Sequence, residues 1–116
     1  MPLQPTDVVA IHQLYASYTF AADSGDSKAY VECFTDDGVF DIGVNRMEGS
    51  DALLQLAKGL PPTPGTRHVC TNILLEGDGD MATGESYVML LETGSSPATI
   101  TMTGRYQDRL VRSPQG

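Results

Sequence analysis

The first half of the chain alternates apolar and polar residues at the three- and four-residue spacing of amphipathic helices. After a helix cap at Thr6-Asp7, this spacing predicts a helix over residues 7–22, carried by Val8, Ile11, Leu14, Tyr15, Tyr18 and Ala22. A turn at residues 23–26 separates it from a second helix over 27–34, and the two form a hairpin. A short strand over 39–42, a loop to residue 49 and a third helix over 51–58, capped by Ser50, follow.

Long strands dominate the second half of the chain. Residues 67–75, 81–92 and 98–111 are rich in β-branched side chains and are separated by turn sequences, which predicts a three-stranded antiparallel meander. A period of two places one set of side chains on one face of the first long strand: His68, Cys70, Asn72 and Leu74. Helices followed by strands indicate one α+β domain over residues 1–116, with a curved sheet wrapped around the helices.

The charge of the chain excludes several kinds of partner. Seven basic residues against 15 acidic ones give a net charge of −8, which repels phosphate backbones and anionic lipids. No apolar stretch has the length of a membrane helix and no signal-peptide pattern is present, so we expect a cytoplasmic protein that binds neither nucleic acid nor membrane. The cysteines and the acidic residues lack the spacing of a zinc or calcium site, so no metal is expected.

The order of several short motifs resembles a known family. The first part of the pattern runs from Ile11 to Tyr18 and continues through Ala22, Asp23, Gly25-Asp26, Tyr30, Phe34-Thr35 and Asp37-Gly38. The second part consists of Arg67-His68-Val69 with Asn72, Ala82 to Tyr87, and Gly104-Arg105-Tyr106 with Asp108. Together they resemble the SnoaL-like proteins of the nuclear transport factor 2-like superfamily, over nearly the whole chain.

The resemblance implies a cone-shaped antiparallel or mixed sheet around three N-terminal helices, with an internal pocket. Relatives of this kind include polyketide cyclases, scytalone dehydratase and a dehydrochlorinase, and others bind ligands or partners without catalysis. In the dehydratase branch an aspartate near the end of the first helix pairs with a histidine on the strand after the third helix; Asp23 and His68 match these positions, and Tyr18 matches a polar pocket residue. A further acid or histidine of some relatives has no match, because Val88-Met89-Leu90-Leu91 stands in that region.

The chemistry of such a pair follows from its side chains. Histidine titrates near neutral pH, so His68 would act as the base, while Asp23 would fix its tautomer. Tyr18 or Tyr30 would donate to a developing oxyanion, and no cofactor is required. The remaining expected ligand contacts are Asn72, beside His68, and an apolar lining made of Val88, Leu90, Met102 and Tyr106.

Two functions remain open from the sequence. The first is a cofactor-independent lyase, isomerase or cyclase that acts on a small hydrophobic molecule through Asp23 and His68. The second is a noncatalytic ligand-binding or dimerisation module, in which Asp23 bonds turn amides or caps the second helix and His68 is structural.

The end of the chain differs from the family pattern. Relatives usually continue into one more strand, whereas this chain stops at Gly116, so a final strand is expected to be absent. The strand over residues 98–111 would then expose backbone amides and apolar side chains that proteins normally cover. We therefore expect a homo-oligomer, namely a dimer packed through the sheet.

Overall fold

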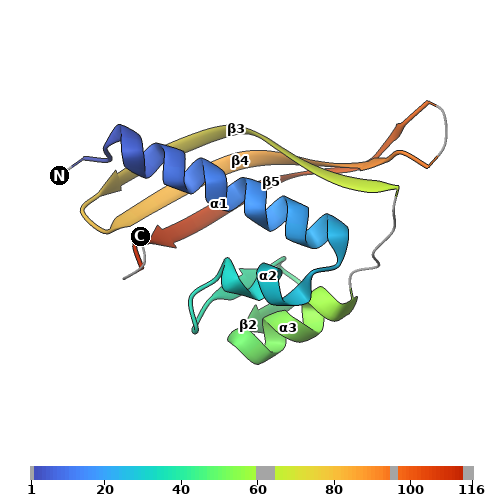
Figure 1. Ribbon diagram of the computed structural model, residues 1–116, viewed down its shortest axis with the longest axis horizontal. Helices are drawn as coiled ribbons and strands as arrows, with labels where there is room; N and C mark the ends of the chain where they lie inside the picture. Colours follow the sequence, from blue (N-terminus) through green and yellow to red (C-terminus); the bar gives the residue numbers. More distant parts are fainter. Residues whose placement is uncertain (1, 60–64, 95–96, 114–116) are drawn as a thin grey trace.

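The fold consists of a three-stranded sheet, one long helix across it, and a smaller group of helices and a hairpin beside that helix (Figure 1). The computed structural model describes residues 2–59, 65–94 and 97–113. In chain order the elements are α1 (Pro5–Ser24), α2 (Ser27–Glu32), β1 (Val39–Asp41), β2 (Arg46–Glu48), α3 (Ser50–Gly59), β3 (Thr66–Asp78), β4 (Met81–Glu92) and β5 (Thr99–Val111). The predicted α+β class is confirmed.

The helices begin differently from the prediction. α1 starts two residues early, because Pro5 fits the first helical turn and the Asp7 carboxylate accepts a hydrogen bond from the Gln4 backbone N–H at 2.9 Å. The predicted cap at Thr6-Asp7 is therefore wrong. Ser50 is already helical and its hydroxyl donates to the carbonyl of Asp36, so it is not the cap of α3. Asp26 caps α2 by accepting from the Ala29 N–H at 3.1 Å.

The segment after β1 was predicted to be a loop, but it contains a second strand. β1 and β2 form an antiparallel hairpin in which Asp41 faces Arg46. Gly43 has a φ of 90°, and its N–H donates to the Asp41 carboxylate at 2.8 Å, which closes the turn. The strand was missed because three residues are too short to show a period.

The meander of the second half is confirmed in the order β3-β4-β5, with both pairs antiparallel. Gly79, with a φ of 64°, and Asp80 form the turn between β3 and β4. The turn expected before β5 includes residues 95 and 96, and the end expected at residue 116 also lies outside the described residues. The sheet is not closed: among the described strands, β3 and β5 each pair only with β4.

β3 contains a bulge that changes the faces of its side chains. The register with β4 shifts between Thr71 and Leu74, and Asn72 has a φ of 58°. Before the bulge, His68 and Cys70 lie opposite Leu90 and Val88; after it, Leu74 lies opposite Glu85. The prediction that Asn72 and Leu74 share the face of His68 is therefore wrong, because the extra residue reverses the alternation.

α1 covers one face of the sheet, which we call the inner face. The buried β4 residues Ala82, Gly84, Ser86 and Val88 point to it, and the alternate residues of β4 form the outer face. A buried cluster of Ala21, Ala22, Tyr30 and Ala57 joins α1, α2 and α3, with Tyr18 and Phe34 packed against it. None of the helices in the described ranges has the length and apolar character needed to cross a membrane.

Gly77 is required by the close packing of the β3–β4 hairpin. A Cβ at this position would lie 2.6 Å from the Met81 carbonyl oxygen and 2.9 Å from the Ala82 Cβ. We expect Gly77→Ala to lower the free energy of unfolding by about 1–3 kcal/mol, because backbone must shift to relieve the overlap. Gly94→Ala is the control, since a Cβ there meets nothing within 4 Å. Urea denaturation of both variants gives the comparison, and equal stabilities would contradict this packing.

Candidate active site

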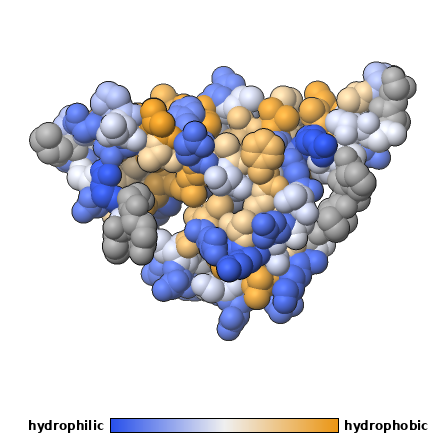
Figure 2. All heavy atoms as spheres, viewed as in Figure 1, coloured by the Kyte–Doolittle hydropathy of each residue, from blue (hydrophilic) through white to orange (hydrophobic). Residues whose placement is uncertain are grey.

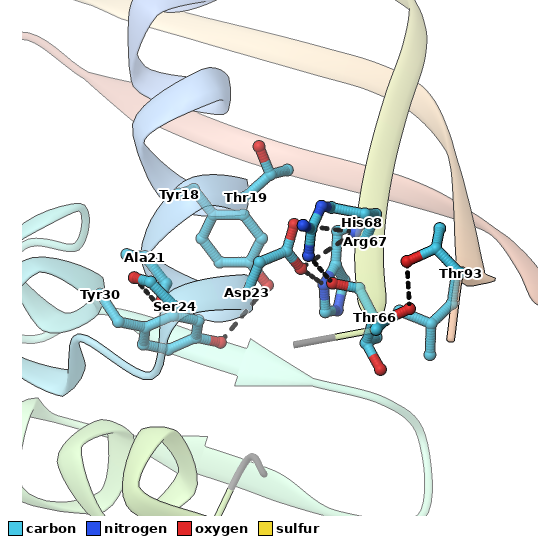
Figure 3. Close-up of polar contacts among 12 residues, drawn as sticks. Tyr18, Thr19, Ala21, Asp23, Ser24, Tyr30, Thr66, Arg67, His68 and Thr93 are labelled. Carbon is cyan, nitrogen blue, oxygen red and sulfur yellow. Dashed lines mark hydrogen bonds and ion pairs between the residues drawn. The ribbon is translucent and has the colours of Figure 1, made fainter. Parts of the chain in front are cut away.

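Asp23 and His68, which are 45 residues apart, form a close side-chain pair between α1 and the sheet (Figure 3). The Asp23 Oδ1 lies 2.6 Å from the His68 Nδ1. The backbone N–H of His68 also donates to both carboxylate oxygens, at 3.0 and 3.1 Å. The Asp23 and His68 side chains keep only 11% and 18% of their exposure, so the pair is largely shielded from water.

The carboxylate determines which ring nitrogen of His68 is available. An ionised carboxylate only accepts hydrogen bonds, so Nδ1 carries the hydrogen that points to Asp23. Nε2 of the neutral ring is then a proton acceptor. The last turn of α1, which contains Asp23 and has no basic residue, places the negative end of the helix dipole beside the ring. Both features place negative charge on the Nδ1 side of the ring.

Three tyrosines form an aromatic group next to this pair. The hydroxyls of Tyr18 and Tyr30 lie 3.3 Å apart, and the Tyr18 ring contacts those of Tyr30 and Tyr106 at centroid distances of 5.1 and 6.1 Å. Burial raises the pKa of all three phenols, so they stay protonated and can donate hydrogen bonds. Figure 3 shows the Tyr18 and Tyr30 hydroxyls pointing toward one another near Asp23.

The apolar residues expected at the site lie on the inner face of the sheet. His68, Leu90 and Met102 face one another across β3, β4 and β5, and the next inner row contains Cys70, Val88 and Gly104. Val88 is buried, whereas Met102, which lies on the inner face of the edge strand β5, is 50% exposed. The sheet therefore supplies a largely apolar surface beside His68.

Asn72 does not join this group, because the bulge turns it away from His68. It is exposed and lines a hollow of about 250 Å³ together with Leu74, Tyr87 and Arg105. A second hollow, of about 380 Å³, is lined mainly by outer-face residues that include Glu76, Thr83 and Arg109. Neither hollow includes Asp23 or His68, so a closed cavity around the pair stays a prediction.

The sequence reasoning missed a second polar pair between α1 and the sheet. The Tyr15 hydroxyl donates to the Asp108 carboxylate at 2.5 Å. Alternation from Tyr106 puts Asp108 on the inner face, and an acidic residue at an inner-face strand position is the signal that identifies it. Within the described ranges, no group of three His, Cys, Asp or Glu side chains is arranged to hold a metal ion.

Comparison with known proteins identifies the family. The sequence model described as the SnoaL-like domain matches residues 4–116. The chain belongs to the SnoaL-like family. No protein of curated function matches this SnoaL-like chain significantly.

Several solved structures share the fold of this chain. A variant of Rv3472 from Mycobacterium tuberculosis, described as of unknown function, has 32% identity over 96% of this chain and 70% of its own, with a TM-score of 0.88. A cystatin-like protein of unknown function from Nostoc punctiforme has 24% identity over 98% and 86% of the two chains, with a TM-score of 0.89. A protein of Novosphingobium aromaticivorans, provisionally assigned as a scytalone dehydratase, has 22% identity over 94% and 76%, with a TM-score of 0.78.

Proposed function

We propose that this SnoaL-like protein is a cofactor-independent acid–base enzyme, a lyase, isomerase or cyclase, that acts on a small hydrophobic molecule. The observation that supports this proposal is the 2.6 Å contact between the Asp23 carboxylate and His68 Nδ1, which leaves Nε2 as the base. The largely apolar inner face beside the pair, with Leu90 and Met102, favours an apolar substrate.

The reaction would begin with His68 Nε2 taking a proton from a carbon next to a carbonyl group. The electron pair of the broken C–H bond moves into the carbonyl, whose oxygen becomes an oxyanion and accepts a hydrogen bond from Tyr18 or Tyr30. The resulting enolate has three outcomes: reprotonation at another carbon, loss of a leaving group, or attack on a second carbonyl. The imidazolium returns its proton to the product or to the leaving group, so no proton is gained or lost overall.

A noncatalytic ligand-binding module is the second candidate function. It is favoured by the position of the two hollows, neither of which includes the Asp23–His68 pair. The Tyr18 ring also favours it, because this ring fills space between α1 and the sheet by packing against Tyr106. In this case the pair would anchor α1 to β3 and the tyrosines would bind a ligand without a reaction.

Deuterium exchange into 2-tetralone tests the enzyme proposal. This small apolar ketone has an acidic C–H bond next to its carbonyl, so it reports proton abstraction without a known substrate. We expect the protein to accelerate exchange in D₂O, followed by ¹H NMR, above the rate with buffer alone. A rate equal to that of buffer, with binding of 2-tetralone demonstrated by shifts of the protein's amide signals, would favour the binding module.

We also propose that the protein forms a dimer through the outer face of the sheet. Leu74, Met81 and Tyr87 are 66%, 54% and 56% exposed on this face. The acidic Glu85 lies beside the basic Arg105 on this face, so the face carries positive as well as negative charge although the net charge of the chain is −8. Its charges can therefore complement those of the same face on a second copy.

Sedimentation velocity at micromolar concentration measures the dimer. We expect the wild-type chain to sediment as a dimer and Tyr87→Glu to sediment as a monomer, because a buried unpaired carboxylate is costly. The side of the molecule that carries α1 also exposes hydrophobic residues (Figure 2). Phe20→Glu is the control, since Phe20 is 74% exposed and belongs to α1 rather than to the sheet. A wild-type monomer at tens of micromolar would contradict the dimer.

A further inference from the structure

Three polar side chains at even intervals attach α1 to the strands and to the residue that follows β5. The contacts are Asp7 with Arg112 at 2.8 Å, Tyr15 with Asp108 at 2.5 Å, and Asp23 with His68 at 2.6 Å. Each step between the helix residues is two turns and a little more, which corresponds to about 12 Å along the helix axis. α1 is therefore held at its start, in its middle and at its end.

Apolar packing alone does not fix the position of α1 along the strands. The buried residues of α1 are Tyr15, Ala21 and Ala22, and the two alanines belong to the cluster that α1 shares with α2 and α3. Tyr15 is thus the buried residue of this helix that contacts the sheet. Val9 and Phe20 of the same helix are 61% and 74% exposed. The polar contacts therefore determine where α1 lies.

The middle contact is shielded from water, and the strands leave room for it. Tyr15 is 7% exposed, and burial raises the pKa of its phenol, so it keeps the hydrogen that it donates to Asp108. Asp108 faces Gly84 on β4, where a Cβ would lie 2.6 Å from the Tyr15 hydroxyl oxygen. By contrast, the Arg112 side chain is 42% exposed, so its pair with Asp7 holds the start of α1 only weakly.

We propose that Tyr15, held by Asp108, is a positioning residue that keeps the Asp23 carboxylate in contact with His68. Tyr15 and Asp23 belong to one unbroken helix, so a shift of the helix at Tyr15 moves Asp23 as well. A displacement of about 1 Å would take the 2.6 Å contact out of its optimal geometry. Asp23 accepts three hydrogen bonds from His68, so the loss of Tyr15 makes opening of the contact more frequent and does not abolish the contact.

The hydrogen on His68 Nδ1 reports this positioning directly. A hydrogen in so short a bond to a carboxylate gives a ¹H NMR signal far downfield, and its exchange with water requires the contact to open. We expect Tyr15→Phe to speed this exchange by about threefold to tenfold, the effect of one ordinary hydrogen bond on an opening equilibrium. Asp108→Asn should keep the wild-type rate, because its amide oxygen still accepts from Tyr15.

The consequence for catalysis rests on the proposed function and has a separate readout. Tyr15 acts on the reaction only through the Asp23–His68 contact, so Tyr15→Phe should lower the maximal rate of deuterium exchange into 2-tetralone and leave the KM unchanged. If the wild type does not accelerate this exchange, the proposed function fails, whereas the Nδ1 signal still decides whether Tyr15 positions the pair.

A control and a second variant complete the test. Val9→Ala changes an exposed side chain of the same helix and should keep the wild-type exchange rate of the Nδ1 hydrogen. Gly84→Ala displaces the Tyr15 hydroxyl without removing it, so it should also speed the exchange and replaces Tyr15→Phe if that variant does not fold. All rates are measured well below the thermal midpoint of each variant. A wild-type rate in Tyr15→Phe, or an equal increase in Val9→Ala, would overturn the proposal.

Discussion

His68→Ala should reduce deuterium exchange into 2-tetralone by about 10²–10⁴-fold, the usual contribution of a general base. Asp23→Asn should lower the same rate, because an amide accepts the Nδ1 hydrogen but does not stabilise the imidazolium with a negative charge. The measurement is the exchange rate by ¹H NMR at equal protein concentration. Both variants should retain the fold, since the two side chains contribute little apolar packing.

His12→Ala is the matched control for the first variant. His12 is the other histidine of the chain and lies exposed on α1, so its removal should leave exchange unchanged. Thermal unfolding of all three variants separates a loss of chemistry from a loss of structure. Exchange that survives in both His68→Ala and Asp23→Asn would refute the assignment of His68 as the base, and unfolding of both would support a structural role.

Leu53→Ala should lower the free energy of unfolding by about 2–5 kcal/mol, which is the largest stability effect that we expect from one substitution. Leu53 on α3 has no exposed surface, so truncation removes buried methyl groups and leaves a cavity. Val44→Ala truncates a side chain that is 87% exposed between β1 and β2 and should change stability by about 0.5 kcal/mol or less. Urea denaturation compares them, and similar losses in both variants would contradict the burial of Leu53.

The helices and long strands were predictable because each extends over enough residues to show a period. The three predicted helices all exist, but the start of α1 depends on Gln4 and Pro5 rather than on Thr6-Asp7. Such errors are local, since competing caps differ by small free energies. Missing the bulge in β3 is a different kind of error, because nothing in the alternation before Asn72 indicates an extra residue.

The candidate site was predicted in part, for reasons that differ between its residues. The contact of Asp23 with His68 joins residues 45 positions apart, and family resemblance, not periodicity, indicated it. Tyr18 and Tyr30 followed from the helical spacing, and their hydroxyls do meet. Asp108 was overlooked because its partner Tyr15 was interpreted as an ordinary core aromatic residue, and only the folded chain brings the two together.

The bulge at Asn72 makes the number of residues in β3 as important as their identity. Upstream of it the inner face takes even-numbered residues such as His68 and Cys70, and downstream it takes odd-numbered ones such as Leu75 and Gly77. Deletion of Asn72 would remove the extra residue and restore a regular alternation, in which His68 and Leu75 both stay on the inner face opposite Leu90 and Gly84. The exposed Asn72 is therefore a residue that β3 can lose without exchanging its two faces.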